Sequence, residues 1–154
     1  MHIIELKERQ DISENIKLCR KYAQLGNFLK ELKKKELPLT VIESVNNDIE
    51  IVNAITHSEM GLMKSVTQKQ TKIIKLLEKE LKIVPTNYYR NLWTALGLSV
   101  FGLPIGSIFG LTFRNGGLLG IGLPIGMLIG MLVGSQMDKK AFEEGRQLDI
   151  EIKN

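Results

Sequence analysis

The chain has 154 residues with 21 basic and 17 acidic side chains, a net charge of +4 and a mean hydropathy of -0.01, values typical of a small soluble domain. The charges are unevenly distributed, because residues 91–137 carry a single one, Arg114, together with eleven of the fourteen glycines. A soluble fold of this size cannot cover two adjacent uncharged segments of more than twenty residues. Composition therefore excludes a wholly soluble, evenly mixed domain and argues against a sizeable enzyme.

The region before this apolar window is basic, and we expect it to contain no secretory signal peptide. Its first fifteen residues are too highly charged to contain an apolar signal core. Residues 1–90 hold 16 basic and 12 acidic side chains, an excess that favours the cytoplasmic side of a membrane. The single cysteine, Cys19, cannot form an internal disulfide, which fits a reducing compartment, and we expect it to be a small core residue.

A first amphipathic helix is expected from residue 12 to about Lys35. Asp11 and Glu14 fit a capping box at its start. Apolar residues then recur at helical spacing. The stripe consists of Ile12, Ile16, Cys19, Tyr22 or Ala23, Leu25, Leu29 and Leu32.

Residues 41–84 form the second part of the helical region. Pro38 interrupts the first helix, and Thr40 with Glu43 offers a new start signal. An unbroken alternation of three-residue and four-residue spacings then predicts a heptad seam. Either one helix of about 65 Å follows, or two helices meet near His57 and Ser58. The seam positions are Ile42, Val45, Ile49, Val52, Thr56, Glu59, Met63, Val66, Gln70, Ile73, Leu77, Glu80 and Val84.

Two uncharged segments follow, Leu92–Phe113 and Asn115–Met137. Each is long enough, at about 30 Å, to cross a hydrocarbon core as a helix. Arg114-Asn115-Gly116-Gly117 between them predicts a tight turn, because Arg114 is charged and the residues after it readily adopt positive φ. We therefore predict an all-α chain with three parts: a cytoplasmic helical hairpin or coiled coil (1–85), a transmembrane hairpin (86–137, spans about 91–113 and 117–137) and a cytoplasmic tail (138–154).

The two spans share a glycine pattern. The segment Gly-Leu-Pro-Ile-Gly occurs at 102–106 and again at 122–126, and further glycines continue at four-residue spacing. Residues four apart lie on one helix face, so each span offers a smooth surface to a neighbouring backbone. Whether these faces meet each other or a second copy is open. The predicted helix-packing residues are Gly102, Gly106, Gly110, Gly122, Gly126, Gly130 and Gly134.

Other residues of the spans predict bends and an interface. Pro104 and Pro124 occupy equivalent positions, and each should bend its helix, either as a paired hinge or as a fixed kink. No ionisable group other than Arg114 lies in the window, which disfavours a coupled transporter and leaves a passive pore as an alternative. Four residues at the start of the first span are predicted to lie at the membrane interface. They are Tyr88, Tyr89, Arg90 and Trp93.

Basic residues recur on one side of the chain just before the membrane. Such a face attracts anionic lipid head groups, although a solvated face partnered by Glu78 and Glu80 is the alternative. The predicted head-group residues are Lys72, Lys75, Lys79 and Lys82.

The tail and the isolated polar residues add little chemistry. Leu148, Ile150 and Ile152 alternate with charged residues, a pattern that suits a short strand. Such a strand needs a neighbour, which could be a partner, another copy or residues 3–6. Disorder of the tail is the alternative. The two histidines and the cysteine match no metal-ligand or nucleophile spacing, and no phosphate-binding loop is present. We predict no enzyme, no metal, no cofactor and no nucleic-acid partner.

Residues 82–149 resemble the small bacterial glycine-zipper membrane proteins with two transmembrane spans. The resemblance rests on VPTNYYRNLW, the paired GLPIG segments and GSQMDKKAFEEGRQLDI, and it covers the C-terminal half only. It implies an inner-membrane location and a packed hairpin, and it supplies no activity. We expect a multi-pass structural protein with both ends in the cytoplasm. It would self-associate as a homo-oligomer through its glycine faces and dock protein partners through its cytoplasmic helices, with an oligomeric pore or membrane-perturbing effector as the alternative.

Overall fold

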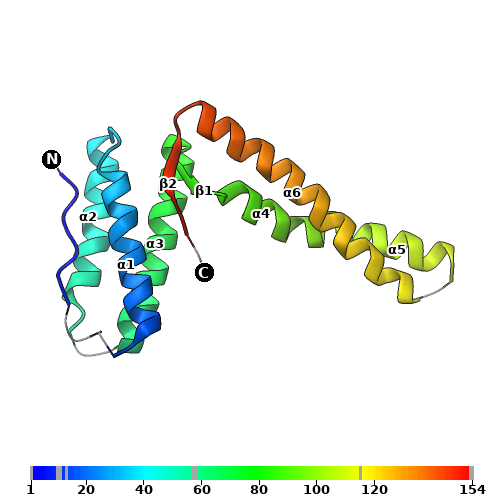
Figure 1. Ribbon diagram of the computed structural model, residues 1–154, viewed down its shortest axis with the longest axis horizontal. Coiled ribbons are helices and arrows are strands. Elements are labelled where there is room, and N and C mark those ends of the chain that lie inside the picture. Colours follow the sequence, from blue (N-terminus) through cyan, green and yellow to red (C-terminus); the bar gives the residue numbers. More distant parts are fainter. Residues whose placement is uncertain (1, 10–11, 13, 57–58, 115, 153–154) are drawn as a thin grey trace. The chain divides into compact units, whose positions relative to one another are not determined.

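The computed structural model describes residues 2–9, 12, 14–56, 59–114 and 116–152, without the side chains of residues 118 and 119. The chain divides into two compact units, one made of residues 1–84 with 148–152 and the other of residues 85–147. The described part is mostly helical (Figure 1). It also contains a two-stranded sheet, in which β1 (Val84–Thr86) pairs with β2 (Gln147–Glu151), so the all-α prediction was incomplete.

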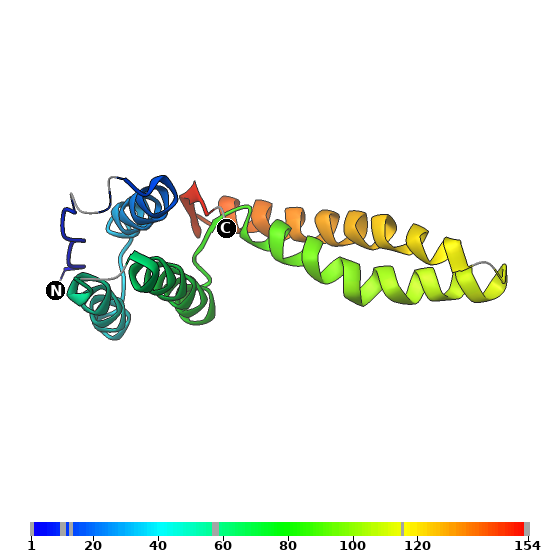
Figure 2. The same ribbon diagram turned by 90° about the horizontal axis from the view of Figure 1, so that it is seen from below.

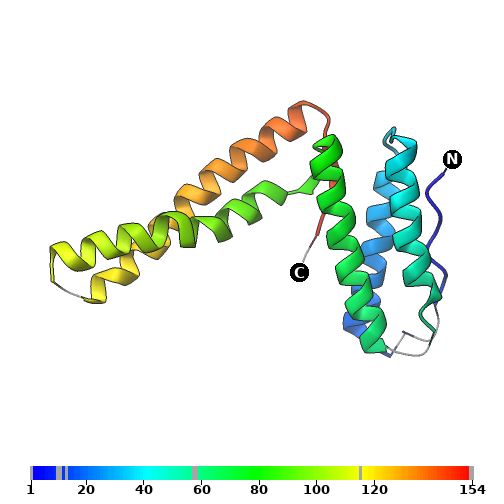
Figure 3. The same cartoon turned by 180° about the vertical axis from the view of Figure 1, so that it is seen from behind.

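The first unit contains the helices α1 (Ile16–Leu32), α2 (Leu39–Ala54) and α3 (Glu59–Leu81). Figure 2 shows these helices nearly end on, packed around a common centre, and Figure 3 shows them side by side from behind. Each contributes fully buried apolar side chains to one core, which stabilises the bundle by removing apolar area from water. The largest are Phe28, Leu18, Leu25, Leu32, Ile49, Leu62, Ile73, Leu77, Val45, Val52 and Val66.

The start and the buried face of α1 differ from the prediction. The helix begins at Ile16, and the side chain of Asn15 caps it by accepting a hydrogen bond of 3.1 Å from the N–H of Leu18. The expected capping box therefore lies before the helix, and its Asp11 falls outside the described residues. The buried face runs through Leu18, so Ile16 is 65% exposed and Cys19 is exposed. The expectation that Cys19 is a core residue was wrong, because its neighbour Leu18 takes that place in the core. The predicted core residues Leu25, Leu29 and Leu32 are buried.

The predicted heptad seam is divided between two helices, α2 and α3. Because α2 ends at Ala54 and α3 begins at Glu59, residues 41–84 form two helices, and the single long helix was wrong. His57 and Ser58, where the alternative places the junction, lie outside the described residues. The apolar seam positions of both helices still face the shared core, which is why the periodicity could not separate the two alternatives.

The second unit is an apolar helical hairpin. Its first arm consists of α4 (Tyr88–Gly97), the π-helical turn η1 (Leu98–Gly102) and α5 (Leu103–Thr112). A connection with the short 3₁₀ helix η2 (Gly116–Leu118) leads into α6 (Leu119–Glu143) (Figure 1). Arg114 takes the left-handed conformation in this connection, with φ of 49°, while Asn115 lies outside the described residues.

Both arms of the hairpin are long and apolar enough to cross a membrane. The candidate spans are Tyr88–Thr112 and Gly120–Glu143, and only 17% and 22% of their most apolar windows are buried. The core helix of a soluble protein would be mostly buried, so these helices differ from that class. Helix α6 continues past Met137, where the span was expected to end, and the strand predicted after it pairs with β1 and not with residues 3–6.

Candidate helix-packing site of the apolar hairpin

The two arms of the hairpin meet backbone to backbone at glycines. A Cβ atom added to Gly122 would lie 2.6 Å from the Cα of Gly106, and one added to Gly126 would lie 2.6 Å from the Cα of Gly102. Real Cβ atoms do not come this close to backbone atoms. The glycines therefore set the distance between the helices, and any larger residue would push the backbones apart.

The same contact continues toward the other end of α6. A Cβ on Gly130 would lie 2.8 Å from the carbonyl carbon of Trp93, and one on Gly134 would lie 2.6 Å from the Cα of Arg90. Two of the residues predicted for the membrane interface thus supply backbone against which α6 packs. Gly110, near the turn, is half-buried.

One member of this glycine line was missed by the sequence reasoning. A Cβ on Gly97 would lie 3.1 Å from the Cα of Gly130, yet Gly97 stands five residues before Gly102 and breaks the four-residue spacing. In a regular helix of 3.6 residues per turn these two glycines would face different directions. The π turn at 98–102, closed by a bond from the Leu103 N–H to the Leu98 carbonyl, widens the helix and returns both to the side of α6.

The two prolines of the repeated segment have different surroundings. Pro104 directly follows the π turn, within the continuous helical arm Tyr88–Thr112. Pro124 lies inside the continuous helix α6. The repeated sequence therefore does not give a repeated local structure, and the bend we predict at each proline stays a prediction.

Asp138 of α6 forms hydrogen bonds with the start of α4, at the end of the hairpin opposite the Arg114 turn. Its Oδ1 accepts a hydrogen bond of 3.0 Å from the Tyr89 N–H, and its Oδ2 accepts one of 2.9 Å from the Arg90 N–H. Both donors belong to the first turn of α4, whose N–H groups have no partner within the helix and whose dipole favours negative charge. Asp138 is only 7% exposed. Sequence reasoning treated it as the first residue of the tail and missed this contact.

Aromatic residues lie at the same end of the hairpin. The rings of Tyr88 and Tyr89 meet edge to face with centroids 5.2 Å apart. Tyr89 is 7% exposed, and Trp93 is half-buried. The four predicted interface residues therefore gather where α4 begins, next to Asp138.

One of the predicted head-group lysines is engaged inside the first unit. The Nζ of Lys72 lies 2.9 Å from the Oδ1 of Asp48, and the Nζ of Lys69 approaches the same atom at 2.9 Å. The Asp48 side chain is 1% exposed, so it requires these cations to compensate for its burial. Lys72 therefore joins α3 to α2 and has a structural partner that the sequence reasoning did not identify.

The remaining predicted head-group lysines differ from one another. Lys79 pairs with Glu80 at 3.4 Å and Lys82 with Glu78 at 3.3 Å. Such exposed pairs contribute little to stability and only partly offset the charge. Among the described residues, Lys75 takes part in no ion pair, and its side chain is exposed.

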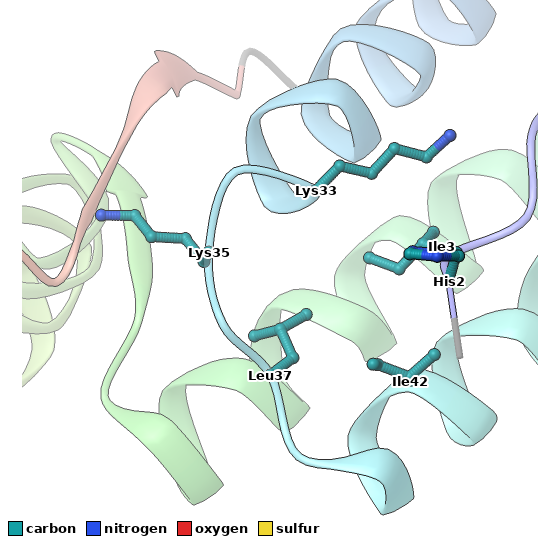
Figure 4. Close-up of a pocket in the computed structure, with 6 residues that line it drawn as sticks. All are labelled: His2, Ile3, Lys33, Lys35, Leu37 and Ile42. Carbon is teal, nitrogen blue, oxygen red and sulfur yellow. The ribbon is translucent and has the colours of Figure 1, made fainter.

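A pocket of the first unit, between the start of the chain and the segment that joins α1 to α2, holds no converging polar groups. Figure 4 shows Ile3, Leu37 and Ile42 around this pocket, while the ammonium groups of Lys33 and Lys35 point in opposite directions. Within the part of the chain that the structure describes, no cluster of three or more His, Cys, Asp or Glu side chains could hold a metal ion. The pocket therefore offers no arrangement from which a reaction can be argued.

No protein family, curated protein or solved structure matches the chain. The resemblance to glycine-zipper membrane proteins therefore stays a prediction. Function has to be argued from the hairpin and the helical unit themselves.

Proposed function

We propose that the chain is a membrane-anchored assembly protein, in which the hairpin spans the inner membrane and the unit of residues 1–84 binds protein partners in the cytoplasm. The observation that carries this proposal is the combination of glycines inside the hairpin with large apolar side chains outside it. An apolar surface of this extent is unfavourable in water, whereas the hydrocarbon core of a bilayer accommodates it. Its most exposed members include Leu111, Leu132, Ile108, Phe113, Leu128 and Leu103.

The residues at the two ends of the hairpin also support a hairpin that crosses the membrane with both chain ends in the cytoplasm. Asp138 and the aromatic residues lie at one end, and the single charge Arg114 lies at the other. Aromatic and charged groups at helix ends suit the two membrane interfaces. Basic residues before and after the hairpin favour both chain ends on the cytoplasmic side.

Self-association is part of the proposal, and the glycine contacts narrow the surfaces it can use. The glycines of the two arms face each other within one chain. Association between copies would therefore use the outer apolar faces or the cytoplasmic unit. Hydroxyl groups do not favour the pore alternative, since Thr94 and Ser107 donate to the carbonyls of Arg90 and Leu103 on their own helix.

The proposal is tested by reconstituting the purified protein into vesicles loaded with a fluorescent dye. We expect the protein to resist alkaline extraction, to give a discrete oligomer on chemical cross-linking and to leave the dye trapped, because the hydroxyls of Thr94 and Ser107 bond to their own helix and line no water-filled path. Release of the dye would favour the pore. Extraction into the aqueous phase, or a cross-linked pattern of monomer only, would contradict anchoring or self-association respectively.

The lysine contacts give a prediction for lipid binding. Replacing Lys75 with Gln should weaken the retention of anionic lipid by about fivefold, because a charge near the surface contributes about 1 kcal/mol. Native mass spectrometry of the protein with phosphatidylglycerol measures this retention. Lys64 lies about three helical turns earlier on the same side of α3, so Lys64→Gln is the matched control. Equal losses in both variants would indicate a general charge effect and contradict a head-group contact at Lys75.

A further inference from the structure

Residues 2–9 form an extended arm along α2 (Figure 1, Figure 3). Asn46 of α2 holds this arm with both atoms of its amide. Its Oδ1 accepts a hydrogen bond of 2.9 Å from the Ile4 N–H, and its Nδ2 donates one of 3.1 Å to the His2 carbonyl. This amide is 7% exposed and pairs with the backbone on both sides of Ile3, as a neighbouring strand would.

Asn53 repeats this arrangement seven residues later. Its Oδ1 accepts a hydrogen bond of 3.0 Å from the Lys7 N–H, and its Nδ2 donates one of 3.0 Å to the Glu5 carbonyl. Seven residues of helix rise about 10.5 Å, and three residues of extended chain span about 10 Å. The distance between the two asparagines along α2 therefore equals the length of three residues of extended peptide.

Side chains of α1 and of Lys33, the residue after it, complete the groove that holds the arm. The Tyr22 hydroxyl donates to the Lys7 carbonyl at 2.8 Å. Lys33 pairs with Glu5 at 2.8 Å, and this hydrogen bond lowers the pKa of the Glu5 carboxyl. A Cβ on Gly26 would lie 3.8 Å from the Cδ1 of Leu6, so the Leu6 side chain lies beside α1 at this glycine.

The ends of the arm are also anchored. Ile3 is 6% exposed and lies beside Leu37 and Ile42 (Figure 4). At the other end, Arg9 donates hydrogen bonds to the carbonyls of Val52 and Ile55, where α2 ends. The groove thus binds the backbone of the arm at Asn46 and at Asn53. It also accommodates one apolar side chain beside each asparagine, Ile3 and Leu6, and binds the charged Arg9 at the far end.

We propose that the groove between α1 and α2 is a binding site for an extended peptide, and that copies of this chain occupy one another's grooves with residues 2–9. The polar contacts go to the arm's backbone and Glu5, so a second copy offers an identical ligand, and exchange of an identical element is a low-cost route to oligomers. This inference rests on the proposed function, because anchoring in one membrane raises the local concentration of arms. It also supplies a surface for association that the glycines, used inside each hairpin, do not.

Mixed disulfides between two full-length variants test the exchange. In a Cys19→Ser background, one population carries Leu6→Cys and the other Gly26→Cys, each with a different affinity tag, and both are reconstituted into the same vesicles. Because each chain holds half of the pair, only an arm in another copy's groove can form the disulfide. We expect a dimer that carries both tags, and we expect Asn46→Ala with Asn53→Ala to lower its yield by about tenfold or more, since four hydrogen bonds are lost.

Three controls decide the result. Placing both cysteines in one chain reports whether the arm occupies its own groove and shows that the variants fold. Gln68→Cys, exposed on α3, replaces Gly26→Cys to measure random collision. An intrachain disulfide without any mixed dimer, or a mixed dimer insensitive to the asparagine changes, would overturn the exchange. Chemical cross-linking in the same vesicles separates the two proposals: oligomers without mixed disulfides refute only the arm exchange, whereas monomers alone refute self-association as well.

Discussion

Replacing Gly126 with alanine should separate the two arms of the hairpin and lower its free energy of unfolding by about 3 kcal/mol. The added methyl group would meet the Gly97 carbonyl and lie 2.6 Å from the Cα of Gly102, and these are backbone atoms that cannot move aside alone. Leucine at the same position should have a larger effect. Unfolding in mixed micelles with increasing sodium dodecyl sulfate measures the change.

Gly120 provides the matched control for this experiment. It lies in the same helix, but a Cβ there would meet no atom within 4 Å. Alanine at Gly120 should leave the hairpin intact or slightly more stable, because alanine has the higher helix propensity. Similar destabilisation by both substitutions would mean that the close contact at Gly126 does not determine stability.

Replacing Asp138 with alanine is expected to lower the free energy of unfolding of the hairpin by about 3 kcal/mol, since hydrogen bonds to a charged acceptor contribute about 1.5–3 kcal/mol each and water compensates in part. The amides of Tyr89 and Arg90 should then exchange their hydrogens faster, because both donate to this carboxylate. Hydrogen exchange with mass spectrometry of the peptide that contains them measures the effect locally.

Two further substitutions calibrate the Asp138 result. Asp138→Asn keeps one acceptor oxygen and should lose about half as much. Glu143→Gln, on the exposed surface of the same helix, should lose nothing measurable. Unchanged exchange at Tyr89 in the alanine variant would show that the carboxylate does not hold the start of α4.

The hairpin could be predicted from sequence because its signals are local. A window of 47 residues with a single charge is long enough for two spans, and glycines four residues apart share a helix face whatever lies opposite. The two helices do pack together over Tyr88–Thr112 and Gly120–Glu143. Their length, their composition and the residues of their contact required no information about distant parts of the chain.

The features that were missed depend on partners far away in sequence. Asp138 caps a helix 49 residues earlier, and Asn46 binds an arm 42 residues earlier, so neither has a local pattern. Gly97 was missed because the π turn alters the phase that a regular helix would keep. Cys19 shows the same difficulty on a smaller scale, because a shift of one residue moves a side chain from the core to the surface.

The glycine line and Asp138 together imply an order of assembly for the hairpin. Contacts beside the Arg114 turn, such as that between Gly106 and Gly122, join residues close in sequence and close only a short loop. The bonds from Tyr89 and Arg90 to Asp138 close the longest loops, and loop entropy makes them the most costly to form first. Contacts beside the turn should therefore form at the lowest entropic cost, and the bonds to Asp138 should complete the hairpin last.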